Sequence, residues 1–212
     1  MPTTTAQLID WMSRFDELIQ EQRGYLTDLD SEVGDGDHGA NMSRGLAAVT
    51  ASLATDPPEF VDELAKSIGM TLVSTVGGAS GPLYGTFFLR FGTSAGHTTK
   101  LTPIELSDAL AAGLAGVVER GKPERDDKTM FDAMEPAVLA FRTGIVDGDV
   151  TYAATLASHA ANAGRDASAD LVARKGRASY LGERSIGHVD PGAASTALLF
   201  QALAETLGRA TA

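Results

Sequence analysis

Apolar residues recur at helical spacing along most of this chain, and this periodicity constrains its fold more than any other feature of the sequence. Thr4 and Gln7 have the spacing of a capping box, and Thr102 and Glu105 repeat it around an N1 proline. The apolar stripe after Thr4 consists of Leu8, Trp11, Met12, Phe15, Leu18 and Ile19. We find no convincing β-hairpin pattern. The expected fold class is therefore all-α.

About eight helices are expected in one domain over residues 1–212, because there is no internal repeat and no long linker. The first helix fades near Arg23, and the acidic stretch after it is expected to be a loop. The other clear helices are expected over about 41–53, 57–68, 102–118, 128–141, 151–174 and 192–207. Segment 70–76 is ambiguous between helix and strand and is taken as a helical continuation, whereas 86–91 stays ambiguous.

The composition excludes several classes of function. The 212 residues include 28 Asp or Glu and 17 Lys or Arg, and the net charge of −11 argues against a nucleic-acid partner. There are no cysteines, so disulfides, thiolate zinc sites and cysteine nucleophiles are ruled out. No signal peptide is recognisable, and no apolar run approaches the roughly 18 residues of a membrane span. We expect a cytoplasmic protein without a membrane partner.

The stretch "LDSEVGDGDHG", residues 29–39, gathers carboxylates and glycines. Asp30, Asp35 and Asp37 can converge if the interleaved glycines adopt positive φ, and such hard oxygen ligands suit Mg²⁺ or Ca²⁺. An EF-hand is excluded, since neither possible frame has glycine at position 6 and glutamate at position 12. A solvated loop that only caps the next helix explains the composition about as well, and His38 alone decides nothing.

Two further stretches are candidates for holding a phosphate. The glycines of "VGGASGPLYG", residues 76–85, can turn backbone N–H groups toward an anion, although close helix packing explains them somewhat better. Residues 174–192 contain four basic and two acidic side chains in an otherwise acidic chain, which favours an anion partner over a surface salt-bridge belt. Residues 116–123 only approximate a P-loop, because Pro123 replaces the required Ser or Thr.

Together these stretches resemble the nucleotide-binding (L) subunits of bacterial dihydroxyacetone kinases. The resemblance covers nearly the whole chain and rests on "LDSEVGDGDHGANMSRG" (29–45), "GMTLVSTVGGASGPLYGTFF" (69–88), "RGKPERDDKTMFDAMEP" (120–136) and "ARKGRASYLGERSIGHVDPGA" (173–193). Four long stretches in the same order are far more specific than any single short motif.

The resemblance implies a barrel of about eight antiparallel amphipathic helices with a nucleotide site at one end. It implies that ADP or ATP is held there through two Mg²⁺ ions, with Asp30, Asp35 and Asp37 as the metal ligands. The implied nucleotide contacts are His38, Gly39, Ala40, Asn41, Ala79, Ser80, Gly121, Met130, Arg177, Asp190, Pro191 and Gly192. Arg177 is also the implied catalytic residue, stabilising charge on the transferred phosphoryl group.

The resemblance also implies partners. A separate K subunit would hold dihydroxyacetone on a histidine of its own, and a phosphotransferase-system M protein would rephosphorylate the bound ADP. A homodimer is a further expectation. Three alternatives stay open: an ATP-exchanging kinase subunit for another ketose such as erythrulose, a non-catalytic coregulator that depends on nucleotide, and a lipid-binding helical barrel.

Overall fold

The computed structural model describes residues 1–145 and 148–209, and this part of the chain is all-α, as predicted. The α-helices are α1 (Thr5–Glu21), α2 (Arg23–Val33), α3 (His38–Thr55), α4 (Val61–Thr75), α5 (Ser80–Ala95), α6 (Pro103–Gly121), α7 (Phe131–Gly144), α8 (Val150–Ala167) and α9 (Pro191–Arg209). Two 3₁₀ segments, η2 (Ser168–Asp170) and η3 (Arg177–Ser185), separate α8 from α9. Strands β1 (Thr3–Thr4) and β2 (Lys100–Leu101) form one short antiparallel pair.

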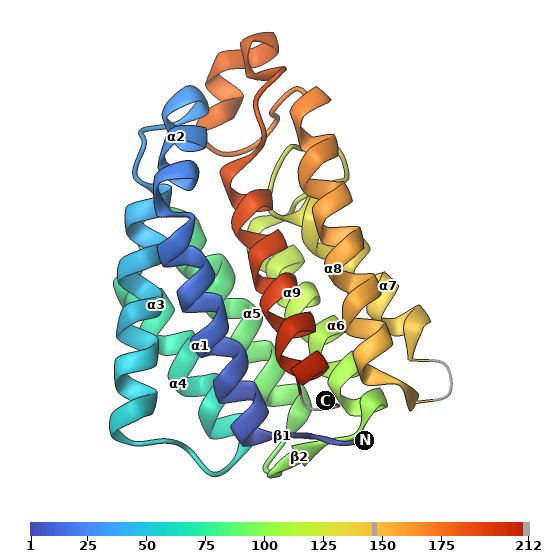
Figure 1. The fold of residues 1–212 in the computed structure, drawn as a ribbon. Helices are drawn as coiled ribbons and strands as arrows, with labels where there is room; N and C mark the ends of the chain where they lie inside the picture. Colours follow the sequence, from blue (N-terminus) through green and yellow to red (C-terminus); the bar gives the residue numbers. More distant parts are fainter. Residues whose placement is uncertain (146–147, 210–212) are drawn as a thin grey trace.

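The helices pack lengthwise in a closed order of neighbours (Figure 1). From α3 to α9 each helix packs against the next, α9 packs against α1, and α1 packs against α3. The shorter α2 lies beside η3 at the end of the molecule away from both termini. Large buried side chains fill the interior, and Trp11 Nε1 donates a hydrogen bond of 2.9 Å to the carbonyl of Leu199. None of the described helices combines the length and apolar character that crossing a bilayer requires.

Local sequence explains where two helices start. Both predicted capping boxes are confirmed: the Thr4 and Thr102 side chains accept hydrogen bonds from the backbone N–H groups of Gln7 and Glu105. The two ambiguous segments are helical: residues 70–75 lie in α4, which ends one residue earlier than expected, and residues 86–91 lie in α5. Leu72 of the first segment and Phe87, Phe88 and Phe91 of the second are buried in helix packing, so tertiary contacts override the strand propensity of both segments.

Several predicted boundaries were wrong, each for a physical reason. Residues 29–33 belong to α2, not to a loop, because Leu26, Asp30 and Val33 form a short buried stripe at helical spacing. Helix α8 ends at Ala167, although helix was expected up to residue 174. There the carbonyl groups of Ser168, Ala169 and Leu171 accept hydrogen bonds from the ammonium group of Lys128. No regular helix therefore continues beyond Ala167.

Candidate functional site

A pocket of about 400 Å³ lies at the end of the molecule formed by α2 and η3. Its walls come from all four sequence stretches that carry the family resemblance. Of the predicted site residues, the lining includes Asp30, Asp35, Asp37, His38, Asn41, Ala79, Ser80, Gly121, Met130, Arg177, Asp190, Pro191 and Gly192. Gly39 and Ala40 are not among the lining residues. A pocket of this volume is large enough for a small-molecule ligand.

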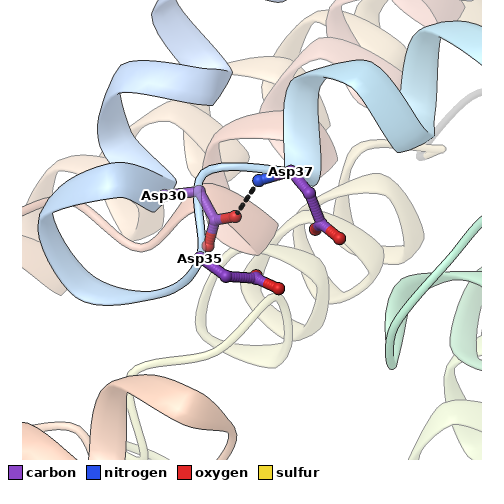
Figure 2. Close-up of side chains that lie close together, drawn as sticks. All are labelled: Asp30, Asp35 and Asp37. Carbon is purple, nitrogen blue, oxygen red and sulfur yellow. Dashed lines mark hydrogen bonds between the residues drawn. The ribbon is translucent and has the colours of Figure 1, made fainter.

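Three carboxylates converge on one wall of the pocket (Figure 2). Asp30 comes from the last turn of α2, and Asp35 and Asp37 come from the connection to α3; one oxygen from each lies within 4.8 Å of the others. Asp30 is buried, and its Oδ2 accepts hydrogen bonds from the backbone N–H groups of Asp37 (2.8 Å) and His38 (3.1 Å). Three hard oxygen donors at this spacing fit a divalent cation such as Mg²⁺.

The interleaved glycines have different roles in shaping this loop. Gly36 has the predicted positive φ, +73°, which a residue with a side chain adopts at a cost. Gly34 and Gly39 do not: a Cβ at Gly34 would overlap the Asp30 carboxylate, and one at Gly39 would overlap the α2 backbone at Arg23 and the Thr27 side chain. Gly39 is therefore a packing residue that lets α2 and α3 approach closely.

His38 connects the acidic loop to the opposite wall of the pocket. The imidazole is buried, with Nε2 3.0 Å from Ser195 Oγ and Nδ1 3.3 Å from Ser80 Oγ. Ser195 Oγ is in turn 2.8 Å from the hydroxyl of the fully buried Tyr84. Burial lowers the pKa of His38 even though Asp30 and Asp37 oppose the shift, so the ring is neutral near pH 7. The network holds α3, α5 and α9 together beneath the pocket.

The glycine stretch forms a turn that leads directly into α5. Gly78 has φ +66°, and Ala79, the N-cap residue of α5, offers no side-chain acceptor to the first turn of the helix. No acidic residue lies in that first turn. The N-terminal N–H groups of α5 and the positive end of its helix dipole are therefore part of the pocket wall. This part of the wall suits the binding of an anion.

Basic side chains also line the pocket, and one of them belongs to η3. Arg177 lies at its first position, and its Nη1 donates a hydrogen bond to Asp35 Oδ2. Lys175 and Arg120 also line the pocket, whereas Arg174 and Arg184 of the predicted basic stretch are not among the lining residues. Part of the basic stretch thus faces the same space as the acidic cluster, as a site for a metal and a phosphate requires.

Asp190 lies at the base of the pocket, immediately before α9. Its Oδ2 accepts a hydrogen bond of 2.7 Å from the backbone N–H of Ala193, so the side chain caps this helix. Burial raises the pKa of Asp190 to about 7, and the carboxylate of Asp132 adds to the shift. A Cβ at Gly192 would lie 3.0 Å from the Asp190 carboxylate and 3.3 Å from Met130, so the absence of a side chain at Gly192 relieves crowding in this part of the pocket.

Lys128 is the main residue that the sequence reasoning missed. It lines the pocket in the connection between α6 and α7, is 1% exposed and has φ +61°. Its neighbours in the sequence form no recognisable phosphate loop or metal motif, so no local signal distinguished it from a surface lysine. Arg120, in the last turn of α6, was missed for the same reason.

The sequence and the fold match a known family. The sequence matches the DAK2 domain over residues 32–205, and the chain belongs to the DAK2-domain family. It is 45% identical over 196 residues to the ADP-binding subunit DhaL of PEP-dependent dihydroxyacetone kinase 1 from Listeria innocua, covering 92% of this chain and 93% of the relative. It is 43% identical over 205 residues to the corresponding Escherichia coli subunit, covering 96% and 98%.

A solved structure supports the same grouping. The dihydroxyacetone kinase of C. freundii in complex with AMP-PNP and Mg²⁺ superposes with a TM-score of 0.74 at 27% identity. The match covers 97% of this chain but 34% of the kinase chain, so this chain spans about a third of that enzyme's length. The chain is thus similar both to separate DhaL subunits and to one part of a longer kinase.

Proposed function

We propose that this chain is the ADP-binding subunit of a dihydroxyacetone kinase and passes the γ-phosphate of a Mg²⁺-bound nucleotide to a ketose held by a separate K subunit. The observation that carries the proposal is the meeting of Asp30, Asp35 and Asp37 with the glycine turn and Arg177 around one pocket. The similarity to DhaL subunits over almost their full length is the reason for proposing dihydroxyacetone, or a related ketose, as the substrate.

The acidic cluster suits the metal half of this function. Two Mg²⁺ ions held there would neutralise the nucleotide phosphates and orient them for transfer. Asp30 is preorganised by two backbone N–H donors, while Asp35 and Asp37 are exposed and can adjust to a ligand. The set lacks the sulfur and imidazole ligands that zinc or copper would favour.

The remaining lining residues suit the nucleotide half. Residues of the glycine turn and the N-terminus of α5 offer N–H donors to phosphate oxygens. Arg177 carries a planar cation at the mouth, where charge on a transferring phosphoryl group would develop. Phosphoryl transfer depends on positioning and charge neutralisation, so no nucleophilic side chain is required from this chain.

The partners follow from the same proposal. A K subunit would present the ketose at the pocket mouth, and a phosphotransferase-system M protein would rephosphorylate ADP in place. The closed order of helix neighbours supports the predicted barrel with the nucleotide site at one end. The single domain, the homodimer and the cytoplasmic location stay predictions.

Titration with ADP tests the proposal directly. ADP should bind in the presence of Mg²⁺ and lose most of its affinity when the metal is chelated. Mixed with a K subunit, the chain should then support phosphorylation of dihydroxyacetone. Erythrulose serves as a second acceptor, and phosphoenolpyruvate plus the phosphotransferase proteins are compared with ATP as the phosphate donor. ADP affinity that does not change when Mg²⁺ is removed contradicts the proposed site. Tight Mg²⁺-dependent ADP binding without any phosphoryl transfer favours the coregulator alternative.

A further inference from the structure

Lys128 is enclosed by carbonyl oxygens. Its Nζ lies 2.7 Å from the carbonyl of Ser185, 2.8 Å from that of Ser168, 3.0 Å from that of Leu171 and 3.3 Å from that of Ala169. An ammonium group has three N–H donors, so these four acceptors leave none for a phosphate. Although Lys128 lines the pocket, its charge is therefore used to hold the protein backbone.

The four carbonyl groups come from the two ends of one loop, residues 168–187. Three lie before Arg177 in the sequence and one lies after it, so the ammonium joins both ends of the segment that carries Arg177. Two other hydrogen bonds close the same base: Gly187 N–H to the carbonyl of Ala169 (2.8 Å), and Ala173 N–H to Ser185 Oγ (2.9 Å). The base of the loop is thus built around a buried cation.

Apolar packing holds this loop only weakly. A small cluster of Val33, Ala173 and Ala178, with Leu181 against it, is separate from the main core. Two of its three buried members are alanines, which remove little apolar surface from water. The ion pair of Arg177 with Asp35 is largely solvent-exposed and adds little. The polar anchor at Lys128 therefore has a large share in fixing where Arg177 lies.

We infer that Lys128 is a built-in cation that takes the place of a bound monovalent ion and positions the Arg177 loop at the mouth of the pocket. A ring of backbone carbonyl groups is the arrangement by which proteins replace the hydration shell of potassium. Lys128 is a positioning residue in this role. Its effect on the nucleotide rests on the proposed function, while its effect on the loop does not.

Substitution by glycine is the direct test. Lys128→Gly keeps the positive φ without strain and leaves an empty carbonyl cage that ammonium or potassium can enter. Lys128→Met keeps the bulk but removes the charge and the donors. Lys122→Gly is the matched control, because Lys122 is also a lysine of positive φ (+46°) but is exposed and does not line the pocket.

The rate of trypsin cleavage measures how often the loop opens, because the loop contains four sites for this protease: Arg174, Lys175, Arg177 and Arg184. In sodium buffer, cleavage within 174–184 should be at least about tenfold faster in Lys128→Gly than in the wild type, because proteolysis follows the population of the open state. Ammonium or potassium should restore protection in Lys128→Gly but not in Lys128→Met. Affinity for Mg²⁺–ADP should fall and recover in parallel, while Lys122→Gly stays at the wild-type values.

The outcomes separate the possibilities. A Lys128→Gly loop that stays protected in sodium buffer, or one that ammonium and potassium leave unprotected, overturns the inference. If Lys128→Gly folds only when ammonium or potassium is present, the built-in cation is supported. If it folds in neither buffer and the loop of Lys128→Met is protected, the cation is not what holds the loop. Rescue of the loop without any ADP binding would instead contradict the proposed function alone.

Discussion

Arg177 donates a hydrogen bond from Nη1 to Oδ2 of Asp35, and this contact joins side chains 142 positions apart in the sequence. The side chains are 60% and 38% exposed, so the pair itself contributes only about 0–1 kcal/mol to stability. The contact matters more for how the pocket can bind a ligand. A cation bound to the acidic cluster would compete with Arg177 for Asp35 and leave the guanidinium free to face a phosphate.

Asp35 and Asp30 should differ when each is replaced by alanine. Asp35→Ala should lower the Mg²⁺-dependent affinity for ADP by at least about tenfold, a loss of about 1.4 kcal/mol, with little change in the free energy of unfolding. Asp30→Ala should also destabilise the fold by about 1–3 kcal/mol, because the N–H groups of Asp37 and His38 lose their acceptor. Calorimetric titration and urea denaturation measure the two effects.

Glu32→Ala is the control for that comparison, since Glu32 is an exposed acid of the same segment that does not line the pocket. It should bind ADP as the wild type does. Unchanged binding by Asp35→Ala would remove this residue from the metal site, and unchanged stability of Asp30→Ala would show that its hydrogen bonds are dispensable.

Arg177→Ala should slow phosphoryl transfer far more than it weakens ADP binding. Loss of one preorganised donor to a developing charge typically lowers kcat by about 10²–10³-fold. Steady-state kinetics with a K subunit, separated into kcat and the KM for nucleotide, give the measurement. Arg177→Lys should recover little of the rate, because an ammonium cannot reproduce a planar two-point donor.

Arg184→Ala provides the control for charge alone, because Arg184 is exposed on the same 3₁₀ segment without lining the pocket. A loss of rate in Arg184→Ala equal to that in Arg177→Ala would mean that the general positive field of the loop, and not Arg177, is responsible.

Gly36 and Gly24 should respond oppositely to alanine. At Gly36 the φ of +73° makes a side chain costly, by about 1–3 kcal/mol, so Gly36→Ala should destabilise the protein and weaken Mg²⁺-dependent ADP binding. Gly24 lies within α2, and a methyl group added there would meet no atom within 4 Å, so Gly24→Ala should stabilise the helix by about 0.5–1 kcal/mol. Thermal denaturation with and without Mg²⁺–ADP measures both, and equal effects at the two positions would contradict this account of the loop.

Helices were the most predictable part of the fold, because their signals are local. The capping boxes at Thr4 and Thr102 identified two helix starts to the residue. The end of α8 was not predictable in this way. It depends on Lys128, a residue about 40 positions earlier in the sequence, whose ammonium takes the carbonyl groups that a further helical turn would have used.

In the site, too, local contacts were predictable from the sequence and contacts between distant segments were not. The convergence of Asp30, Asp35 and Asp37 was predictable, since three carboxylates within eight residues can meet only through a local turn. The hydrogen bonds of His38 to Ser80 and Ser195 were not, because they join three helices far apart in the chain. Sequence spacing contains no information about such contacts unless a family pattern supplies it.

Asp190 should make stability fall as the pH rises toward neutrality. Burial raises the pKa of Asp190 to about 7, whereas an unfolded aspartate titrates near 3.9. Between these values the folded protein binds a proton that the unfolded chain has lost, so this group lowers the free energy of unfolding by up to about 1.4 kcal/mol per pH unit. Asp190→Asn keeps an oxygen acceptor for the Ala193 N–H but cannot titrate.

The stability difference between Asp190→Asn and the wild type should therefore increase from pH 4 to pH 7 and level off above. Urea denaturation in EDTA at a series of pH values measures it without bound metal. Glu105→Gln is a control in which the effect has the opposite sign. Hydrogen bonds from Thr102 lower the pKa of Glu105. The stability of the wild type relative to Glu105→Gln should therefore fall only as the pH drops below about 4.5. A pH-independent difference for Asp190→Asn would show that Asp190 is ionised throughout this range and that its charge is compensated inside the pocket.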